Sequence, residues 1–249
     1  MKIDPNLKMP PLLNKYLVMT LNNMGMMTTY LDEYTQEFIA FAKRQSKPVL
    51  EVGAAYGAAT IAALEAGATV IANDIEPQHL QILYNQTPEN CRSRLTLLPG
   101  KFPSVLNLPH SSLAGCYIAR TLGFLAIPDI QYSLQLIYDT LMPKGKLFII
   151  TATVYTQTLK NIIPLYEERL LENSEWPGYF TNLKQLVEER YIPYTPDKLH
   201  FLDPTILTRE LERVGFVVDK AEFFSRDDFP PQYQLDGREA SIVIAHKPQ

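Results

Sequence analysis

Two glycines and two acidic residues form the part of the sequence whose chemistry is clearest. Gly53 and Gly57 follow the short apolar run 49–52, which contains Glu51, and Asp74 lies at the end of the next apolar run. A glycine directly after a buried strand lets the chain turn sharply and lets a ligand approach the backbone. The N-terminus of the helix that follows offers unpaired N–H groups. In a parallel α/β sheet Asp74 would lie beside this loop and accept both hydroxyls of a ribose, so the pattern predicts a nucleoside site.

The spacing of the glycines and the acid before them indicate which nucleoside. Dinucleotide-binding loops read G-x-G-x-x-G, whereas Ala55 replaces the second glycine here and the spacing is G-x-x-x-G. Glu51 would repel a pyrophosphate and stabilise a positively charged ligand. A buried charge without a partner is costly, which favours a ligand role for this residue. S-adenosylmethionine, with its sulfonium and its amino group, fits the loop.

The glycine loop must be positioned by a middle stretch, residues 47–155, in which apolar strands alternate with helix-length segments. Gly67 and Pro77 stand where a helix C-cap and a first helical turn prefer them. Strands separated in this way need long crossovers, so the pattern predicts a parallel sheet. The predicted strands are 48–52, 68–75, 95–98, 113–119 and 147–153, and the predicted helices are 58–66, one beginning at 76–77, and 127–142.

The flanking segments are predicted to cover this sheet and to complete it. Residues 1–46 are expected to form an N-terminal helical cap, because apolar residues recur at helical spacing between 31 and 42. Residues 47–249 are expected to form one S-adenosylmethionine-binding domain, with 156–202 as a helical insertion or lid. A helix from 203 to 215 and two antiparallel strands, 216–224 and 241–246, would close a mixed sheet.

Composition excludes several classes of protein. The 249 residues are 46% apolar and 20% charged with a net charge of −4, which is typical of a soluble globular α/β protein. The acidic balance argues against a nucleic-acid binder. No apolar run approaches the ~20 residues that span a bilayer, and the first residues lack a signal-peptide pattern. With two cysteines only, Cys91 and Cys116, a disulfide scaffold is excluded. We therefore expect a cytoplasmic protein without a membrane partner.

Together these segments resemble the class I, Rossmann-like, S-adenosylmethionine-dependent methyltransferases. The resemblance rests on the first motif at 51–57 (EVGAAYG), the second at 70–75 (VIANDI) and the turn before the fifth strand at 141–148 (LMPKGKLF). It covers residues 47–155 well and the two closing strands more loosely. It implies an α/β fold with a seven-stranded, mostly parallel sheet in the order 3-2-1-4-5-7-6 and helices on both faces.

The resemblance also implies roles for single residues. Gly53 and the loop to Gly57 would cradle the amino-acid end of the cofactor, Glu51 would reach its amino group, and Asp74 would hold the ribose hydroxyls. Many family members have a polar or acidic residue after the third strand, where this chain has Gly-Lys-Phe at 100–102. Phe102 is therefore expected to contact the adenine instead. The predicted cofactor-binding set is Glu51, Gly53, Ala54, Gly57, Asp74, Ile75, Lys101, Phe102 and Arg120.

The acceptor side of the site is predicted from fewer signals. Arg120 follows the fourth strand, where family members place residues near the transferred methyl group, and Arg120 and Tyr155 are candidates to orient an acceptor. The Asp/Asn-Pro-Pro-aromatic signature of amino-methylating members does not occur, nor does a carboxylate cluster of the metal-dependent type. No histidine pair has metal-ligand spacing, so no metal is expected. The predicted aromatic lid consists of Tyr30, Tyr34, Trp176 and Tyr179, and His79, His110 and His200 fall in predicted surface segments.

The leading hypothesis is methyl transfer from S-adenosylmethionine to a small or medium-sized acceptor by in-line displacement, with S-adenosylhomocysteine as the product. One alternative is a non-catalytic S-adenosylmethionine-binding partner or regulatory subunit, because the third motif departs from the family. A second is a methyltransferase acting on protein or RNA, although the acidic charge argues against RNA. A nicotinamide oxidoreductase is disfavoured by Ala55 in the glycine loop.

Overall fold

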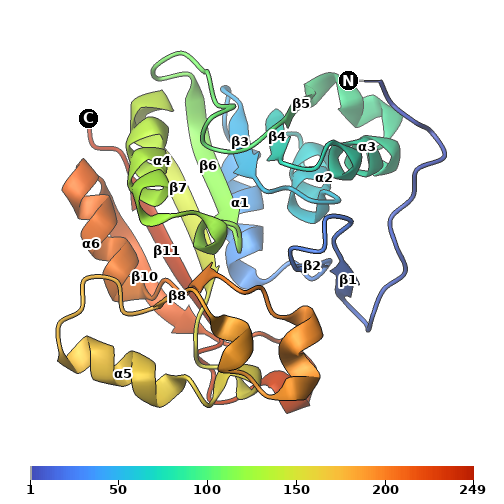
Figure 1. Ribbon diagram of the computed structural model, residues 1–249. Coiled ribbons are helices and arrows are strands. Elements are labelled where there is room, and N and C mark those ends of the chain that lie inside the picture. The colour runs from blue at the N-terminus through green and yellow to red at the C-terminus, as the bar shows by residue number, and fades with distance from the viewer. Residues whose placement is uncertain (1) are drawn as a thin grey trace.

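The central element of the fold is a mixed seven-stranded sheet. The computed structural model describes residues 2–249, except for the side chain of Tyr194. The sheet has the order β10-β11-β7-β6-β3-β4-β5 (Figure 1). Counted along the chain from β3 and read from the β5 edge, this is 3-2-1-4-5-7-6, so the predicted fold class is confirmed. The bounds are β3 (Val49–Val52), β4 (Val70–Asp74), β5 (Leu95–Pro99), β6 (Leu113–Ala119), β7 (Leu141–Ala152), β10 (Val217–Phe224) and β11 (Ala240–His246).

Strand direction follows the length of each connection. The five strands β3 to β7 pair in parallel, because a helix-length segment separates each from the next. The strand β11 pairs antiparallel with both β7 and β10. The parallel strands therefore bring their carboxyl ends to one edge of the sheet, which is where residues that follow β3, β4 and β6 must meet.

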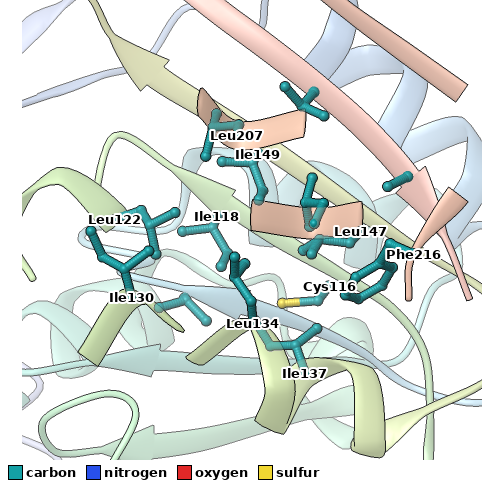
Figure 2. Close-up of a cluster of buried hydrophobic side chains, with 14 of the residues drawn as sticks. Cys116, Ile118, Leu122, Ile130, Leu134, Ile137, Leu147, Ile149, Leu207 and Phe216 are labelled. Carbon is teal, nitrogen blue, oxygen red and sulfur yellow. The ribbon is translucent and has the colours of Figure 1, made fainter. Parts of the chain in front are cut away.

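Helices cover both faces of the sheet. On one face, α4 (Ile127–Thr140) and α6 (Pro204–Val214) bury Leu134 and Leu207 against Ile118 and Ile149 of the strands. Figure 2 shows these apolar side chains pointing toward one another around Cys116. On the other face, α1 (Glu33–Ala42) and α2 (Ala58–Glu65) pack on strand residues of the opposite parity, and α3 (Pro77–Gln86) packs on Ala72.

Local signals determine where several of these helices begin and end. Asp203 accepts the backbone N–H of Ile206 as the N-cap of α6, and Gly215 ends that helix with φ of 106°. Asp32 caps α1 in the same way through the N–H of Thr35. Both helices thus begin at a short acidic side chain, and the cap of α1 also enters the site described below.

The first 46 residues differ from the predicted helical cap. Leu17–Met19 (β1) and Met26–Thr28 (β2) form an antiparallel pair, and within residues 2–46 only α1 is α-helical. Strands of three residues are too short to show a period of two, so the pairing left no pattern in the sequence. We refer to residues 17–28 as the hairpin. Whether 47–249 is a domain of its own stays a prediction.

The predicted insertion is mixed rather than helical. It contains α5 (Ile163–Leu171) and an antiparallel pair, β8 (Tyr179–Phe180) with β9 (Leu199–His200). Short 3₁₀ turns are Gln157–Leu159, Leu183–Gln185 and Glu189–Tyr194. Its core, which includes Ile162, Tyr166 and Phe180, is separate from the two cores of the sheet. In Figure 1 this segment, yellow to orange, lies below the sheet, on the opposite side of the view from α3.

The remaining 3₁₀ turns connect elements of the sheet: Glu89–Arg94, Leu122–Phe124 and Pro231–Tyr233. Among residues 2–249, no helix has both the length and the apolar composition that a membrane crossing requires.

Candidate functional site

A cavity of about 440 Å³ lies at the carboxyl ends of β3, β4 and β6. The hairpin, the loop after β3, the end of β4 and the insertion all contribute to its lining. Eight of the nine residues predicted to bind a cofactor line this one cavity, namely Glu51, Gly53, Ala54, Asp74, Ile75, Lys101, Phe102 and Arg120. Gly57 does not line it. This glycine is the N-cap of α2 with φ of 86°, and a Cβ there would meet the Cγ of Leu83 at 2.4 Å.

In the glycine loop, residues 53–57, the backbone N–H groups of residues 54–57 are used within the protein. Ala54 donates to the carbonyl of Asn73 at 2.8 Å, and Gly57 donates to the carbonyl of Ala54 at 2.8 Å. Ala55 donates to Asp74 Oδ2 at 2.8 Å, and Tyr56 donates to the sulfur of Met27 at 3.3 Å. These four N–H groups are therefore not available to a ligand. The prediction of unpaired N–H groups concerns the first turn of α2, which begins at Ala58.

Gly53 has two reasons to be glycine. Its φ is 71°, a left-handed conformation that side chains disfavour, and a Cβ there would lie 2.1 Å from Thr121 Oγ1. Thr121 follows β6, so the missing side chain lets the loop after β6 approach the loop after β3. The close approach that the sequence predicted at Gly53 is thus made by the protein's own chain.

Glu51 is a buried carboxyl at the floor of the cavity. Only 5% of the residue is exposed, and its Oε2 accepts a hydrogen bond from the hydroxyl of Thr60. Burial raises the pKa of Glu51 to about 7, and the negative charge of Asp74 adds to the rise while the Thr60 hydrogen bond opposes it. A ligand cation beside this carboxyl would offset the cost of burying its charge.

Asp74 holds three hydrogen bonds before any ligand arrives. Its Oδ1 accepts the N–H of Glu76 at 2.9 Å and lies 3.0 Å from His79 Nδ1, while Oδ2 accepts the N–H of Ala55. Two carboxylate oxygens offer about four acceptor positions. One position on Oδ2 therefore remains, which is fewer than the two that both ribose hydroxyls would need.

His79 is a site residue that the sequence analysis placed on the surface. It is 1% exposed, lines the cavity, and its Nε2 accepts the N–H of Leu21 from the hairpin at 3.0 Å. Its position five residues after Asp74 was a signal, because the ring can reach back to the end of the strand from the first turn of α3. No pattern in the sequence indicates the hairpin that buries it.

Ile75 and Phe102 contribute apolar surface to the lining of the cavity. Ile75 remains 49% exposed, which is unusual for an isoleucine beside a buried strand, whereas Phe102 is 5% exposed. Asn73 holds the backbone after β5 in place by donating to the carbonyls of Leu98 and Gly100 at 2.8 and 3.0 Å. Lys101 is mostly exposed and lies 3.7 Å from Asp129.

Arg120 brings a positive charge to the end of β6. Its Nη2 donates to Asp32 Oδ2 at 3.1 Å, whereas its buried Nε has no hydrogen-bond partner. Its φ is 58°, a left-handed conformation that non-glycine residues rarely adopt and that often marks a functional site. A buried cationic donor without an acceptor is costly, so this N–H group is suited to donate a hydrogen bond to a ligand oxygen.

A second arginine lines the cavity from the loop between β10 and β11. Arg226 forms a bidentate pair with Asp228, with distances of 2.6 and 2.5 Å, and lies over the ring of Phe229. Its charge and that of Arg120 lower the pKa of Asp228 despite its burial. The Arg226 guanidinium is thus already paired, unlike the Nε of Arg120. No spacing in the sequence indicated Asp32, Arg226 or Asp228 as site residues, because only the fold brings Asp32 to Arg120 and Arg226 to the cavity.

The predicted aromatic lid is mostly wrong. Tyr30 lines the cavity, but Tyr34 packs against Phe224 in the core beside α1. Trp176 and Tyr179 pack against His200, which is itself buried rather than on the surface.

Tyr155, a predicted acceptor-orienting residue, does not line the cavity. It lies among Tyr166, Phe223 and Arg238. The side chains that do close the cavity come from the hairpin, the insertion and two loops, and include Met24, Met26, Met27, Phe124, Thr156, Thr158, Leu159, Leu183, Leu199 and Phe229. Among residues 2–249, no three His, Cys, Asp or Glu side chains are grouped as metal ligands.

The fold is that of solved S-adenosylmethionine-dependent methyltransferases. One from Methanosarcina mazei is 15% identical with a TM-score of 0.63, covering 85% of this chain and 97% of that chain. One from Mesorhizobium loti is 16% identical with a TM-score of 0.61, covering 85% and 95%. The glycopeptide N-methyltransferase MtfA, complexed with (S)-adenosyl-L-methionine, is 21% identical with a TM-score of 0.56, covering 86% and 87%. No protein-family model and no curated protein matches the sequence.

Proposed function

We propose that the protein is an S-adenosylmethionine-dependent methyltransferase that acts on a small or medium-sized acceptor. The observation that carries this proposal is the placement of Glu51, Asp74 and Arg120 around one cavity at the carboxyl ends of the central strands. In open α/β sheets ligands bind at this edge. The fold of known methyltransferases supports the same assignment.

The side chains around the cavity suit S-adenosylmethionine group by group. The buried carboxyl of Glu51 suits the amino group, and the remaining acceptor position on Asp74 suits a ribose hydroxyl. The unpartnered Nε of Arg120 suits the carboxylate of the amino-acid end. Ile75 and Phe102 offer apolar surface to the adenine at the other end. Cofactor binding by these residues is thus supported by the charge and exposure of each.

The same geometry disfavours a dinucleotide. A pyrophosphate is normally held by free N–H groups of the glycine loop and the helix after it. Here the N–H groups of residues 54–57 are bonded within the protein. Glu51 adds a negative charge in the same place when it is ionised, so an anionic ligand would meet repulsion there.

In the reaction, the protein positions the cofactor and the acceptor and excludes water from the cavity. When bound, S-adenosylmethionine supplies an electrophilic methyl group on a sulfonium that is already a good leaving group, so alignment can account for much of the acceleration. Met26 of the hairpin and Leu159 of the insertion present apolar surface to the cavity from two sides. Removing water from such a site strengthens the interactions of Glu51 and Arg120 with ligand charges.

The lining also limits the acceptor. The hairpin and the insertion both border the cavity, which favours a small molecule over a folded macromolecule. Besides the charged groups, the polar part of the cavity lining includes the threonines 121, 153, 156, 158 and 195. An acceptor with an apolar body and a hydrogen-bonding group fits this lining.

The test is turnover of S-adenosylmethionine carrying an isotopically labelled methyl group. Purified protein is incubated with a library of small amines, phenols, thiols and carboxylic acids, and separately with protein and RNA, and formation of S-adenosylhomocysteine is followed. We expect label transfer to at least one small acceptor. Binding without turnover on any acceptor would support the non-catalytic alternative, and label found only on protein or RNA would support a macromolecular substrate.

A further inference from the structure

The imidazole of His79 joins two parts of the cavity that are far apart in the sequence. Its Nδ1 lies 3.0 Å from Asp74 Oδ1, and its Nε2 lies 3.0 Å from the backbone nitrogen of Leu21. A backbone N–H can only donate, so Nε2 is the acceptor. The ring proton then sits on Nδ1 and is donated to Asp74, which assigns the tautomer from the hydrogen bonds.

A second side chain fastens the hairpin to the same place. Tyr56 belongs to the glycine loop, and its hydroxyl donates to the carbonyl of Met19 at 2.9 Å while its N–H reaches the sulfur of Met27. The rings of Tyr56 and His79 are in edge contact with centroids 5.0 Å apart, and both residues are buried. The glycine loop therefore places the buried ring of Tyr56 under the hairpin, and α3 places the buried ring of His79 there.

The bonds of His79 determine what Asp74 can offer to a ligand. With Oδ1 occupied by His79 and the N–H of Glu76, the carboxylate is held in one orientation. Oδ2 accepts Ala55 and has one position left. A ribose therefore meets one fixed acceptor oxygen.

We propose that His79 is a positioning residue that orients the carboxylate of Asp74 for one ribose hydroxyl and, through Leu21, fastens the hairpin over the cavity. The proposal rests on the proposed function, since it assigns the ribose to Asp74. Because the same imidazole bonds to Leu21 and to Asp74, hairpin closure and ribose recognition are coupled. Without the bond to Leu21 the hairpin is less firmly held, and without the bond to Asp74 the carboxylate can turn away from the ribose hydroxyl.

Three substitutions separate the two bonds. His79→Asn keeps an amide nitrogen near the position of Nδ1 but is too short to reach Leu21. His79→Gln places an amide oxygen near the position of Nε2 and loses the fixed donor to Asp74. His79→Phe removes both bonds and keeps a ring. His110→Asn, at an exposed histidine, is the matched control.

Two measurements are made on the full-length chain. Isothermal titration gives the Kd of S-adenosylhomocysteine and of its 2′-deoxy and 3′-deoxy analogues. We expect one analogue to bind the wild-type protein about tenfold more weakly, the loss typical of one hydrogen bond to a charged group. This ratio should fall toward one in the Phe and Gln variants and persist in the Asn variant and the control.

Hydrogen exchange of the unliganded protein gives the second readout. Hairpin amides, including that of Leu21, should exchange faster in the Phe and Asn variants than in the wild type, the Gln variant and the control. An unchanged ribose ratio in the Phe and Gln variants would overturn the orienting role. Unchanged hairpin exchange in the Phe and Asn variants would overturn the fastening role.

The two readouts also distinguish this proposal from the proposed function. If the wild-type protein does not bind S-adenosylhomocysteine, the proposed function fails, and the ribose role of His79 fails with it. The exchange experiment needs no ligand, so the fastening of the hairpin is decided in either case. Binding by the wild type with a ribose ratio that His79 does not affect would leave the function standing and overturn the positioning role.

Discussion

At the scale of single residues, Glu51 links ligand binding to stability. Its pKa is raised from 4.5 to about 7 because the carboxyl is buried, with Asp74 nearby. A group whose pKa is higher in the folded state adds stability at low pH, and this contribution is lost as the pH rises through the folded pKa. The same ionised carboxylate that suits a ligand cation therefore weakens the empty protein above pH 7.

The substitution Glu51→Gln tests this link. We expect the stability of the variant relative to wild type to be higher at pH 8 than at pH 5 by about 2.5 kcal/mol, because most of the loss caused by the pKa shift from 4.5 to about 7 falls between these pH values and each unit corresponds to about 1.4 kcal/mol. Urea unfolding at the two pH values measures it. S-adenosylhomocysteine should also bind the variant more weakly, and wild-type affinity should fall as the pH drops from 8 to 6. A variant whose relative stability is the same at both pH values would contradict the account.

Arg120 provides a second test at this scale. Replacing it by Gln removes the buried donor that lacks a partner. We expect S-adenosylhomocysteine to bind Arg120→Gln about 10- to 100-fold more weakly, the range for a hydrogen bond between charged groups. 5′-Methylthioadenosine lacks the amino-acid end and should bind both proteins alike. An equal loss of affinity for the two ligands would indicate a structural role for Arg120. Unchanged affinity for both would indicate that Arg120 contacts the acceptor rather than the cofactor.

At the scale of elements, the unit from β3 to β4 was predictable because local chemistry decides it. The strand β3 begins at Val49, one residue after the prediction, and ends at Val52 as predicted. The helix α2 begins at Ala58 as predicted and ends at Glu65, one residue before the prediction. Glycine at 53 and 67 and proline at 77 act through their own backbone conformations, so their effect is visible in the sequence. The same holds for Asp203 and Gly215 at the ends of α6.

The hairpin and its contacts could not be predicted in this way. Its pairing and its anchors come from tertiary contacts, such as the one between Leu21 and His79, which are 58 positions apart. His79 was expected on the surface because α3 alone would expose it. The pair of Arg120 with Asp32 depends likewise on where α1 packs on the sheet. The place of Arg226 in the cavity lining depends on where the β10–β11 loop returns to the sheet.

The glycine loop gives a prediction at this scale. Gly53→Ala meets both an unfavourable φ and a Cβ 2.1 Å from Thr121 Oγ1, whereas Gly67→Ala has φ of 108° and no atom within 4 Å. We expect Gly67→Ala to cost about 1–2 kcal/mol of stability from backbone strain. Gly53→Ala should cost about 1–3 kcal/mol more from overpacking. Denaturant unfolding compares the two, and equal costs would show that the contact with Thr121 relaxes freely.

At the scale of the whole molecule, the sheet brings together residues from several separate segments. Glu51 of β3, Asp74 at the end of β4 and Arg120 directly after β6 supply charged groups, while the hairpin and the insertion close the cavity. The sheet and its order could be anticipated from the alternation of strands and crossovers. The roles of the hairpin and the insertion could not be anticipated, because an aromatic residue such as Trp176 packs equally well into a core or a pocket.

The most direct test of the central claim is thermal unfolding of the wild-type protein with S-adenosylmethionine, S-adenosylhomocysteine or NAD. A ligand at a hundred times its Kd stabilises the folded state by about 2.7 kcal/mol. For a chain of this size the Tm should rise by roughly 5–11 °C. We expect this rise with the two adenosyl ligands and none with NAD. A rise with NAD alone, or no shift with any of the three, would contradict the assignment of the cavity to S-adenosylmethionine.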